Sequence, residues 1–170
     1  MRTHALAIIT LCLLVTASPI KAETITGTPW WTRVVDGDTL HLPNHKIVLA
    51  GIDAPEPAQQ CQTATGANWA CGEDATKRLV ELMVDEVVCE LHDKDDLGRD
   101  RATCTSNGLD VAQVLVREGL AVAEYGDQYQ ADEAQAREAK RGIWAGAFMR
   151  PRDWRYANRQ RNREESHNQQ

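Results

Sequence analysis

The pattern of apolar and polar positions predicts five short strands in the first two thirds of the chain. Residues 27–52 contain three strand-like runs separated by the turn-forming pairs Asp36-Gly37 and Pro43-Asn44. Residues 86–106 contain two more runs around an acidic turn. Between the two groups, residues 56–72 form a loop of polar and small residues.

Three segments have helical periodicity. In residues 72–86, apolar side chains recur at helical spacing behind a pair of acids. Asp110 can cap a second, short helix that Gly119 ends, and residues 125–144 predict a third helix. Since strands come first and no βαβ alternation is visible, we expect a small α+β domain. A five-stranded OB-fold barrel with three helices fits this length.

The two ends of the chain differ from the segment between them. Residues 1–22 combine a basic start with an apolar run too short to span a bilayer, which is typical of a signal peptide. An uncleaved anchor is the less favoured alternative. We therefore expect a secreted or periplasmic protein whose domain covers residues 23–154. Residues 155–170 form a polar, arginine-rich tail that we expect to be disordered.

Charge is distributed unevenly along the expected mature chain. Without residues 1–22, 17 lysines and arginines stand against 25 acids, a net charge of −8. From Arg150 onward there are six arginines and three acids, so this end carries +3 and the rest carries −11. An acidic body does not attract nucleic acid by itself. A polyanion would have to be held by a basic pocket, a cation or the tail.

Four cysteines remain after the expected cleavage, and they allow three disulfide connectivities. A zinc site is disfavoured because no C-x-x-C pair is present. Cys89 and Cys104 lie on two strands joined by a turn and can face each other across the ladder. This leaves Cys61 and Cys71 to close a short loop.

Three acids lie at the ends of predicted strands. Asp38 follows a hairpin turn, while Asp53 and Glu56 follow the apolar strand 46–52. Each has a purely structural interpretation, since Asp-Gly suits a tight turn and an aspartate before proline can cap its own backbone. If the two strands are neighbours, however, the three carboxylates converge. They would then have raised pKa values or bind a hard cation such as Ca²⁺.

Arginines follow the acidic turn. Arg99 comes after Gly98, and Arg101 lies on the same face of the next strand. Fixed guanidinium groups beside carboxylates and a cation suit a phosphate oxygen. The alternative is that they pair with local aspartates on a solvated turn.

Five motifs in order resemble one enzyme family. The segments VVDGDT, LAGIDAPE, LGRDRA, LVREGLA and EAKRGIW together resemble the thermonucleases, the staphylococcal-nuclease-like family, over residues 30–154. The resemblance implies an OB-fold hydrolase that cleaves DNA and RNA phosphodiesters with Ca²⁺. It also implies nucleic acid as the substrate. We expect a monomer without stable membrane association after the signal peptide is cleaved.

The resemblance also implies roles for individual residues. Three would supply calcium ligands: Asp38, Asp53 and, through its carbonyl, Ala54. Glu56 would be the general base, and Arg99 would stabilise charge on the phosphate in the transition state. Tyr125 would line the nucleotide pocket.

The chain departs from the family pattern at the phosphate site. The family has an arginine where this chain has Val48, and a tyrosine where it has Leu97. Lys46, on the same strand face as Val48, and Arg101 are the nearby cations that we expect to contact substrate instead. A lysine cannot reproduce a bidentate guanidinium.

Two functions therefore follow from the sequence. The first is a secreted calcium-dependent nuclease with reduced or altered activity. The second is a catalytically degenerate accessory or binding protein that keeps the barrel and the cation site. Because some members of the family are encoded among exopolysaccharide-biosynthesis genes, the second function includes a link to exopolysaccharide biosynthesis.

Overall fold

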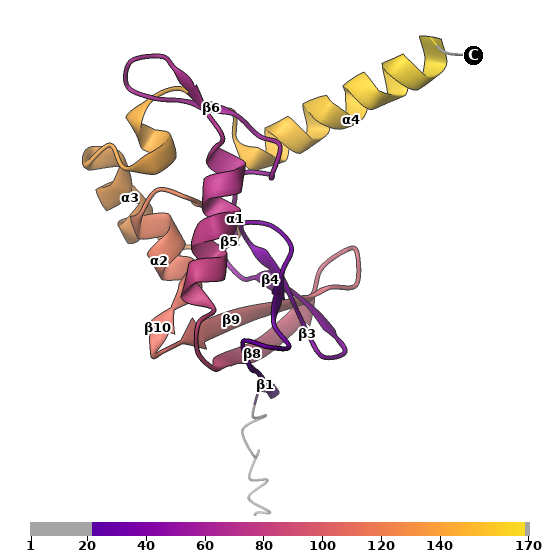
Figure 1. Cartoon of the computed structure of the whole chain (residues 1–170), viewed down its shortest axis with the longest axis vertical. Coiled ribbons are helices and arrows are strands. Elements are labelled where there is room, and N and C mark those ends of the chain that lie inside the picture. Colours follow the sequence, from indigo (N-terminus) through magenta and orange to yellow (C-terminus); the bar gives the residue numbers. More distant parts are fainter. Residues whose placement is uncertain (1–21, 169–170) are drawn as a thin grey trace, which may run out of the picture.

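The structure, a computed structural model, describes residues 22–168 and has an α+β fold built on one curled sheet (Figure 1). Five strands have four or more residues: β1 (Thr24–Gly27), β3 (Thr39–Leu42), β4 (His45–Leu49), β8 (Val87–Lys94) and β9 (Asp100–Ser106). Shorter strands are β2 (Arg33–Val34), β5 (Ile52–Asp53), β6 (Cys61–Gln62), β7 (Asn68–Trp69), β10 (Leu109–Asp110) and β11 (Val122–Ala123). The expected signal peptide lies outside the described residues except for Ala22.

The sheet has the strand order β1-β8-β9-β4-β3-β2, with β10 also paired to β9. All neighbours are antiparallel except β4 and β9, whose parallel register pairs Val48 with Arg101. This pairing closes β3–β4 onto β8–β9 and curls the sheet into a half-barrel (Figure 1). The expected OB-fold-like α+β class is therefore confirmed.

Four α-helices accompany the sheet, one more than the sequence predicts. They are α1 (Cys71–Leu82), α2 (Val111–Arg117), α3 (Gln130–Glu138) and α4 (Pro151–Asn168), with a short 3₁₀ turn, η1 (Gly142–Ala145), before α4. Asp110 caps α2 as predicted, since its side chain accepts a hydrogen bond from the Gln113 N–H. The main core lies between the sheet and helices α1 and α2, where Leu40, Leu79 and Leu115 are fully buried.

Both expected disulfides are present. Cys89 and Cys104 are directly opposite each other on β8 and β9 within the main core. Cys61 and Cys71 join the small β6–β7 hairpin to the start of α1. A second apolar cluster forms around this bond and includes Val122 and Ile143.

The C-terminal segment differs from the expectation of a disordered tail. From Pro151 to Asn168 it forms α4, which runs outward from the body (Figure 1). Proline suits the first position of a helix, and contacts with the body hold the first turns of α4 in place. The tail was expected to be disordered because it contains few apolar residues. Its contacts with the body cannot be seen in its composition. Across the described residues, no helix has the length and apolar character needed to cross a membrane.

Candidate active site

One cavity of about 470 Å³ collects opposite charges at the end of the half-barrel. Its carboxylates are Asp36, Asp38, Asp53, Glu56, Asp95 and Asp96. Its arginines are Arg99, Arg101, Arg155 and Arg159. The acids come from the turn before β3, the end of β5 and the β8–β9 turn, whereas the arginines come from β9 with its turn and from α4. Segments far apart in the sequence thus build a single polar site.

Asp38 lies at the start of β3 and has fixed hydrogen-bond donors on both of its oxygens. The Thr39 hydroxyl donates to Oδ1 over 3.0 Å, and the Ala54 N–H donates to Oδ2 over 2.9 Å. Burial, followed by the charges of Asp36 and Asp53, raises the pKa of Asp38 to about 8. The group therefore lacks a positive partner strong enough to keep it ionised at lower pH.

Asp53 and Glu56 share one positive partner, Arg155 of α4. Arg155 Nη1 lies 2.7 Å from Asp53 Oδ1 and 3.0 Å from Glu56 Oε1, while Nη2 donates to Asp53 Oδ2 over 3.1 Å. Asp53 is buried, and burial raises the pKa of both carboxyls more than the guanidinium lowers it. Arg155 is therefore a fixed cation within the acidic cluster.

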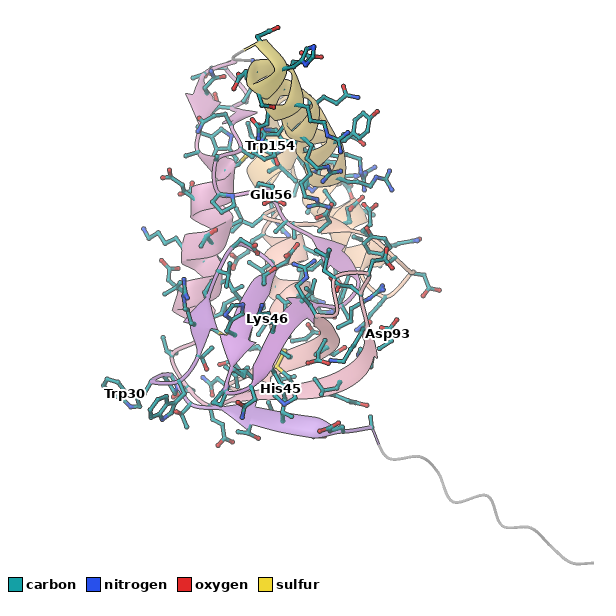
Figure 2. The ribbon with its side chains drawn as sticks, turned by 90° about the vertical axis from the view of Figure 1, so that its right-hand side faces the viewer. Trp30, His45, Lys46, Glu56, Asp93 and Trp154 are labelled. Carbon is teal, nitrogen blue, oxygen red and sulfur yellow. A yellow bond between two sulfur atoms is a disulfide. The ribbon has the colours of Figure 1, made fainter. Side chains whose placement is uncertain are left out.

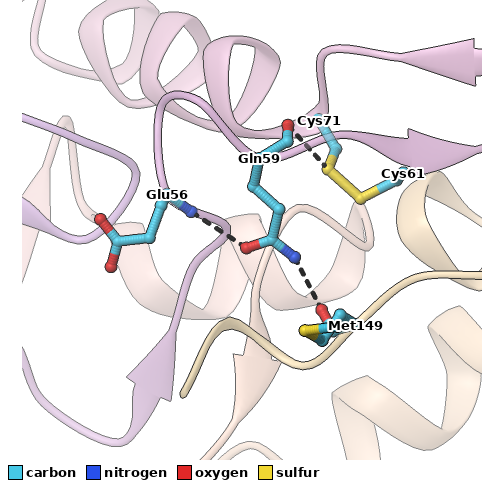
Figure 3. Close-up of a disulfide and its surroundings, with 5 residues drawn as sticks. All are labelled: Glu56, Gln59, Cys61, Cys71 and Met149. Carbon is cyan, nitrogen blue, oxygen red and sulfur yellow. Dashed lines mark hydrogen bonds between the residues drawn. A yellow bond between two sulfur atoms is a disulfide. The ribbon is translucent and has the colours of Figure 1, made fainter. Parts of the chain in front are cut away.

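The approach of Arg155 depends on two anchors at the start of α4. Figure 3 shows Gln59, which is fully buried, accepting a hydrogen bond from the Glu56 N–H and donating to the Met149 carbonyl over 2.7 Å. Glu124 pairs with Arg150 at 3.2 Å and with Arg152 at 3.0 Å. The same glutamine thus sets the backbone of Glu56 and the entry to the helix that supplies Arg155.

The loop that carries Glu56 packs closely against the start of α1. A Cβ atom at Gly72 would lie 1.6 Å from the Glu56 carbonyl oxygen. The carbonyl oxygen of Gln59 also contacts Sγ of Cys71, 3.5 Å away, which ties the loop to the Cys61–Cys71 disulfide (Figure 3). Only glycine permits this approach, so α1 and the disulfide fix the position of the candidate base.

Arg99 and Arg101 face the cavity from β9 and its turn. Asp95 orients Arg99, since its carboxylate accepts from the Arg99 N–H over 2.9 Å and from Nε over 2.7 Å. Although burial alone would raise the pKa of Asp95, these bonds hold that pKa below its ordinary value. Arg101 has a looser ion pair, 3.5 Å from Nε to Asp93 Oδ1. Arg99 Nη1 donates to the Thr39 hydroxyl over 3.5 Å. Within residues 22–168, neither Nη2 of Arg99 nor the guanidinium of Arg101 donates a hydrogen bond, so these N–H groups can turn toward a phosphate.

The structure brings most of the residues predicted from the sequence to this cavity. They are Asp38, Val48, Asp53, Glu56, Leu97, Arg99, Arg101 and Tyr125. Val48 is half-buried between Thr39 and Arg101, and Tyr125 is 66% exposed at the rim. Lys46 does not line the cavity. In Figure 2 it lies on the sheet, farther from α4 than Glu56 does.

Sequence reasoning missed Arg155, Arg159 and Gln59. The arginines fall in the segment that was expected to be disordered, although the Pro151 start and the spacing of four between the arginines are helix signals. Gln59 carries no signal, because a glutamine in a polar loop resembles any exposed residue.

The oxygen groups around Asp38 and Asp53 have the chemistry of a hard-cation site. Two carboxylates and nearby backbone carbonyls are the ligands that Ca²⁺ prefers, and a cation would offset the raised pKa of Asp38. Among residues 22–168, however, no three His, Cys, Asp or Glu side chains are grouped to hold a metal. The residues fit a cation on condition that Arg155 releases Asp53.

Comparisons with known proteins indicate one family. Residues 46–146 match the family described as staphylococcal nuclease homologue. The chain is 30% identical over 148 residues to the succinoglycan biosynthesis protein ExoI of Rhizobium meliloti (strain 1021), an alignment covering 84% of this chain and 76% of that protein.

Two endonucleases of Bacillus subtilis (strain 168) are also similar. The SPbeta prophage-derived endonuclease YokF is 33% identical over 129 residues, covering 66% of this chain and 42% of YokF. Endonuclease YncB is 31% identical over 134 residues, covering 66% of this chain and 59% of YncB. The chain therefore spans only about half the length of these two relatives. Asp38 and α4 lie outside the residues that match the family.

Proposed function

Because the chain belongs to the staphylococcal nuclease homologue family, we propose that it is a nuclease that hydrolyses DNA or RNA phosphodiesters with the help of Ca²⁺. One observation carries the proposal. Six carboxylates and four arginines line a single cavity, so groups that can activate water face groups that can hold a phosphate. Two relatives, YokF and YncB, are named as endonucleases.

In this proposal Glu56 accepts a proton from the water that attacks phosphorus. Burial raises the pKa of Glu56 above its ordinary value, which makes it a stronger base than a solvated glutamate. Arg99, oriented by Asp95, donates to the phosphoryl oxygens as negative charge develops and to the leaving oxygen as the P–O bond breaks. Tyr125 lies at the rim, where a nucleobase can stack on its exposed ring.

Asp38, Asp53 and the Ala54 carbonyl would hold the calcium ion. Bound there, the cation would offset phosphate charge and lower the pKa of the attacking water. Asp38 must be ionised to bind it, and Asp53 must exchange Arg155 for it. We therefore assign Arg155 two positions: on the carboxylates in the cation-free protein, and on the substrate phosphate in the loaded one.

Arg155 would then provide the guanidinium that position 48 lacks. Val48 and Arg155 line the same cavity, so a guanidinium arriving from α4 can reach the space that the valine leaves open. The two disulfides favour an oxidising compartment, in agreement with an extracellular or periplasmic site of action.

Single-turnover cleavage of labelled DNA and RNA tests the proposal directly. We expect cleavage with Ca²⁺ and none with a chelator. Glu56→Gln should lower the rate by about 10²–10⁴, the usual contribution of a general base. Glu86→Gln, at an exposed glutamate that does not line the cavity, is the matched control. Equal rates with calcium and chelator would exclude the calcium part of the mechanism.

Calcium binding itself is measured without turnover. Calcium at about 100 times its Kd should stabilise the protein by about 2.7 kcal/mol, seen as a rise in Tm. Asp53→Asn should abolish this rise, while Arg155→Gln should give a larger rise at low calcium because the competing guanidinium is gone. If Arg155→Gln binds calcium no better than the wild type, the guanidinium and the cation do not compete.

A second candidate function is an accessory role in exopolysaccharide biosynthesis without catalysis. It is favoured by the similarity to ExoI, whose alignment covers more of this chain than either endonuclease alignment. Substituting valine for the arginine of the family pattern is consistent with lost catalysis. The cleavage assay separates the two functions, because an accessory protein would bind calcium and yet leave both nucleic acids intact.

A further inference from the structure

The arginines of α4 are arranged on one face of the helix. Arg155, Arg159 and Arg163 follow one another at intervals of four, so they fall within an arc of about 80° at 100° per residue. We call these three residues the arginine face of α4. The acids of α4, Asp153, Glu164 and Glu165, lie about 120–140° away from Arg159 on the same geometry.

This face begins inside the candidate active site. Arg155 and Arg159 both line the cavity, and Arg163 continues the row beyond it. With a rise of 1.5 Å per residue, Arg155 and Arg163 are about 12 Å apart along the helix axis. At the 3.4 Å spacing of charges along one strand of B-form DNA, the row spans about three to four nucleotides.

The outer part of the row is available for a ligand. Arg159 and Arg163 are exposed, and in residues 22–168 neither guanidinium takes part in an ion pair or a hydrogen bond. Arg161 is also exposed, but it points about 160° away from Arg159 and donates to the Asn158 side chain over 2.9 Å. Figure 1 shows α4 projecting from the body, so its faces are open to solvent.

The surroundings select the kind of ligand. The part of the protein before α4 has a net negative charge, so it repels the phosphates of a nucleic acid strand that enters the cavity. The arginines attract these phosphates. Apart from Trp154 and Tyr156, α4 carries few large apolar side chains, and it has no apolar face that could enter a lipid bilayer. Tyr156 directly follows Arg155 in α4 and is 60% exposed, so its ring can stack on a base.

We infer that the arginine face of α4 is a binding surface for the phosphodiester backbone of a nucleic acid strand that leaves the catalytic cavity. The inference rests on the proposed nuclease function, because it extends the substrate path of the same site. The helix lies outside residues 46–146, which match the family, and it is not part of the curled sheet (Figure 1). It would make the protein prefer long strands over short ones.

Salt-dependent binding of a labelled oligothymidylate to the full chain in chelator tests the inference without cleavage. The variant Arg159→Gln/Arg163→Gln removes two charges from the row. The matched control, Arg161→Gln/Lys77→Gln, removes two charges from the far side of α4 and from α1. For single strands the slope of log K against log salt should weaken by about 1.4 in the first variant and remain unchanged in the control.

Cleavage gives a second readout. The single variant Arg163→Gln should lower kcat/KM for a long strand and leave a dinucleotide unaffected, since Arg163 lies beyond the cavity and a dinucleotide bound in the cavity does not reach it. An unchanged salt slope in the variant Arg159→Gln/Arg163→Gln overturns the inference, even where cleavage is intact and the nuclease function stands. If the salt slope weakens in the variant but the wild type cleaves no nucleic acid, the binding surface is supported and the nuclease function is rejected. Binding to vesicles of anionic phospholipid, with none to the oligonucleotide, overturns it in favour of a membrane surface.

Discussion

At the scale of single residues, the most informative contact joins Arg155 to Asp53 and Glu56. A buried aspartate and a candidate general base share one guanidinium that the sequence places about a hundred positions away. Removing one partner of such a buried ion pair is destabilising, because the other charge is left buried without a counter-charge. The contact therefore offsets the charge of the acidic cluster in the absence of a cation. In the proposed mechanism it must rearrange before Glu56 can accept a proton.

The first prediction concerns the exchange of guanidinium groups between positions 155 and 48. Arg155→Gln should lower the single-turnover rate at saturating calcium by about 10²–10³, the usual effect of losing one donor to a transition-state charge. Adding Val48→Arg to Arg155→Gln should raise the single-turnover rate at least tenfold, since position 48 lines the same cavity and is only half-buried. In the wild-type background the gain should be smaller.

The control for this exchange is Val35→Arg, which adds a charge at an exposed valine outside the cavity. Melting temperatures of all variants exclude simple loss of folding. If Val48→Arg raises the cleavage rate by the same factor in the wild-type and Arg155→Gln backgrounds, the two positions act independently. A folded Val48→Arg with no gain in either background would favour the accessory-protein function.

At the scale of elements, the Cys61–Cys71 disulfide supports the site and the Cys89–Cys104 disulfide supports the core. The first joins the β6–β7 hairpin to α1 beside Gln59, and the second crosses β8 and β9 away from the cavity. Their sequence separations are 10 and 15 residues. Loops of this size imply similar entropic stabilisation, about 3 kcal/mol each.

We predict that the two disulfides are separable by function. Replacing either pair with serines should lower the free energy of unfolding by about 3 kcal/mol, measured by denaturant titration. Only Cys61→Ser/Cys71→Ser should also lower the cleavage rate at a temperature where both variants are folded, because the loop of Gln59, which anchors Glu56 and α4, is then no longer held by the disulfide. Equal rates in the two variants would show that Gln59 holds the loop without the disulfide.

At the scale of the whole molecule, acidic groups of two kinds control the dependence of stability on pH. Burial raises the pKa of Asp38, Asp53 and Glu56, so the folded state holds protons that the unfolded chain has already released. Stability from these groups is present at low pH and is lost as pH rises from about 4 to about 8. Asp95 and Asp100 have lowered pKa values, so their contribution is lost only below the ordinary range of an aspartate.

The cation-free protein should therefore be more stable near pH 5 than near pH 8, and calcium should reverse the order. Binding calcium requires ionised Asp38, so the calcium-induced rise in Tm should grow with pH up to about 8. In chelator, Asp38→Asn should weaken the dependence of Tm on pH, and it should also remove the rise in Tm that calcium causes. Asp85→Asn, at an exposed aspartate, should change neither. A wild-type Tm in chelator that increases from pH 5 to pH 8 would contradict the raised pKa values.

The sequence alone determined the barrel, the helix caps, the disulfides and most of the cavity, because these depend on local spacing. Alternating strands, the Asp110 cap and carboxylates at strand ends are all visible within a few residues. The resemblance added the order of motifs, which placed Asp38, Glu56 and Arg99 in one site.

Tertiary structure alone decided what the C-terminal segment does. The pairing of Arg155 with Asp53, the bridge of Gln59 to Met149 and the placing of Lys46 outside the cavity all depend on which elements pack together. A polar, arginine-rich segment has too little apolar surface to reveal its fold, since its order comes from ion pairs with groups far away in sequence. Those partners become neighbours only once the barrel has closed.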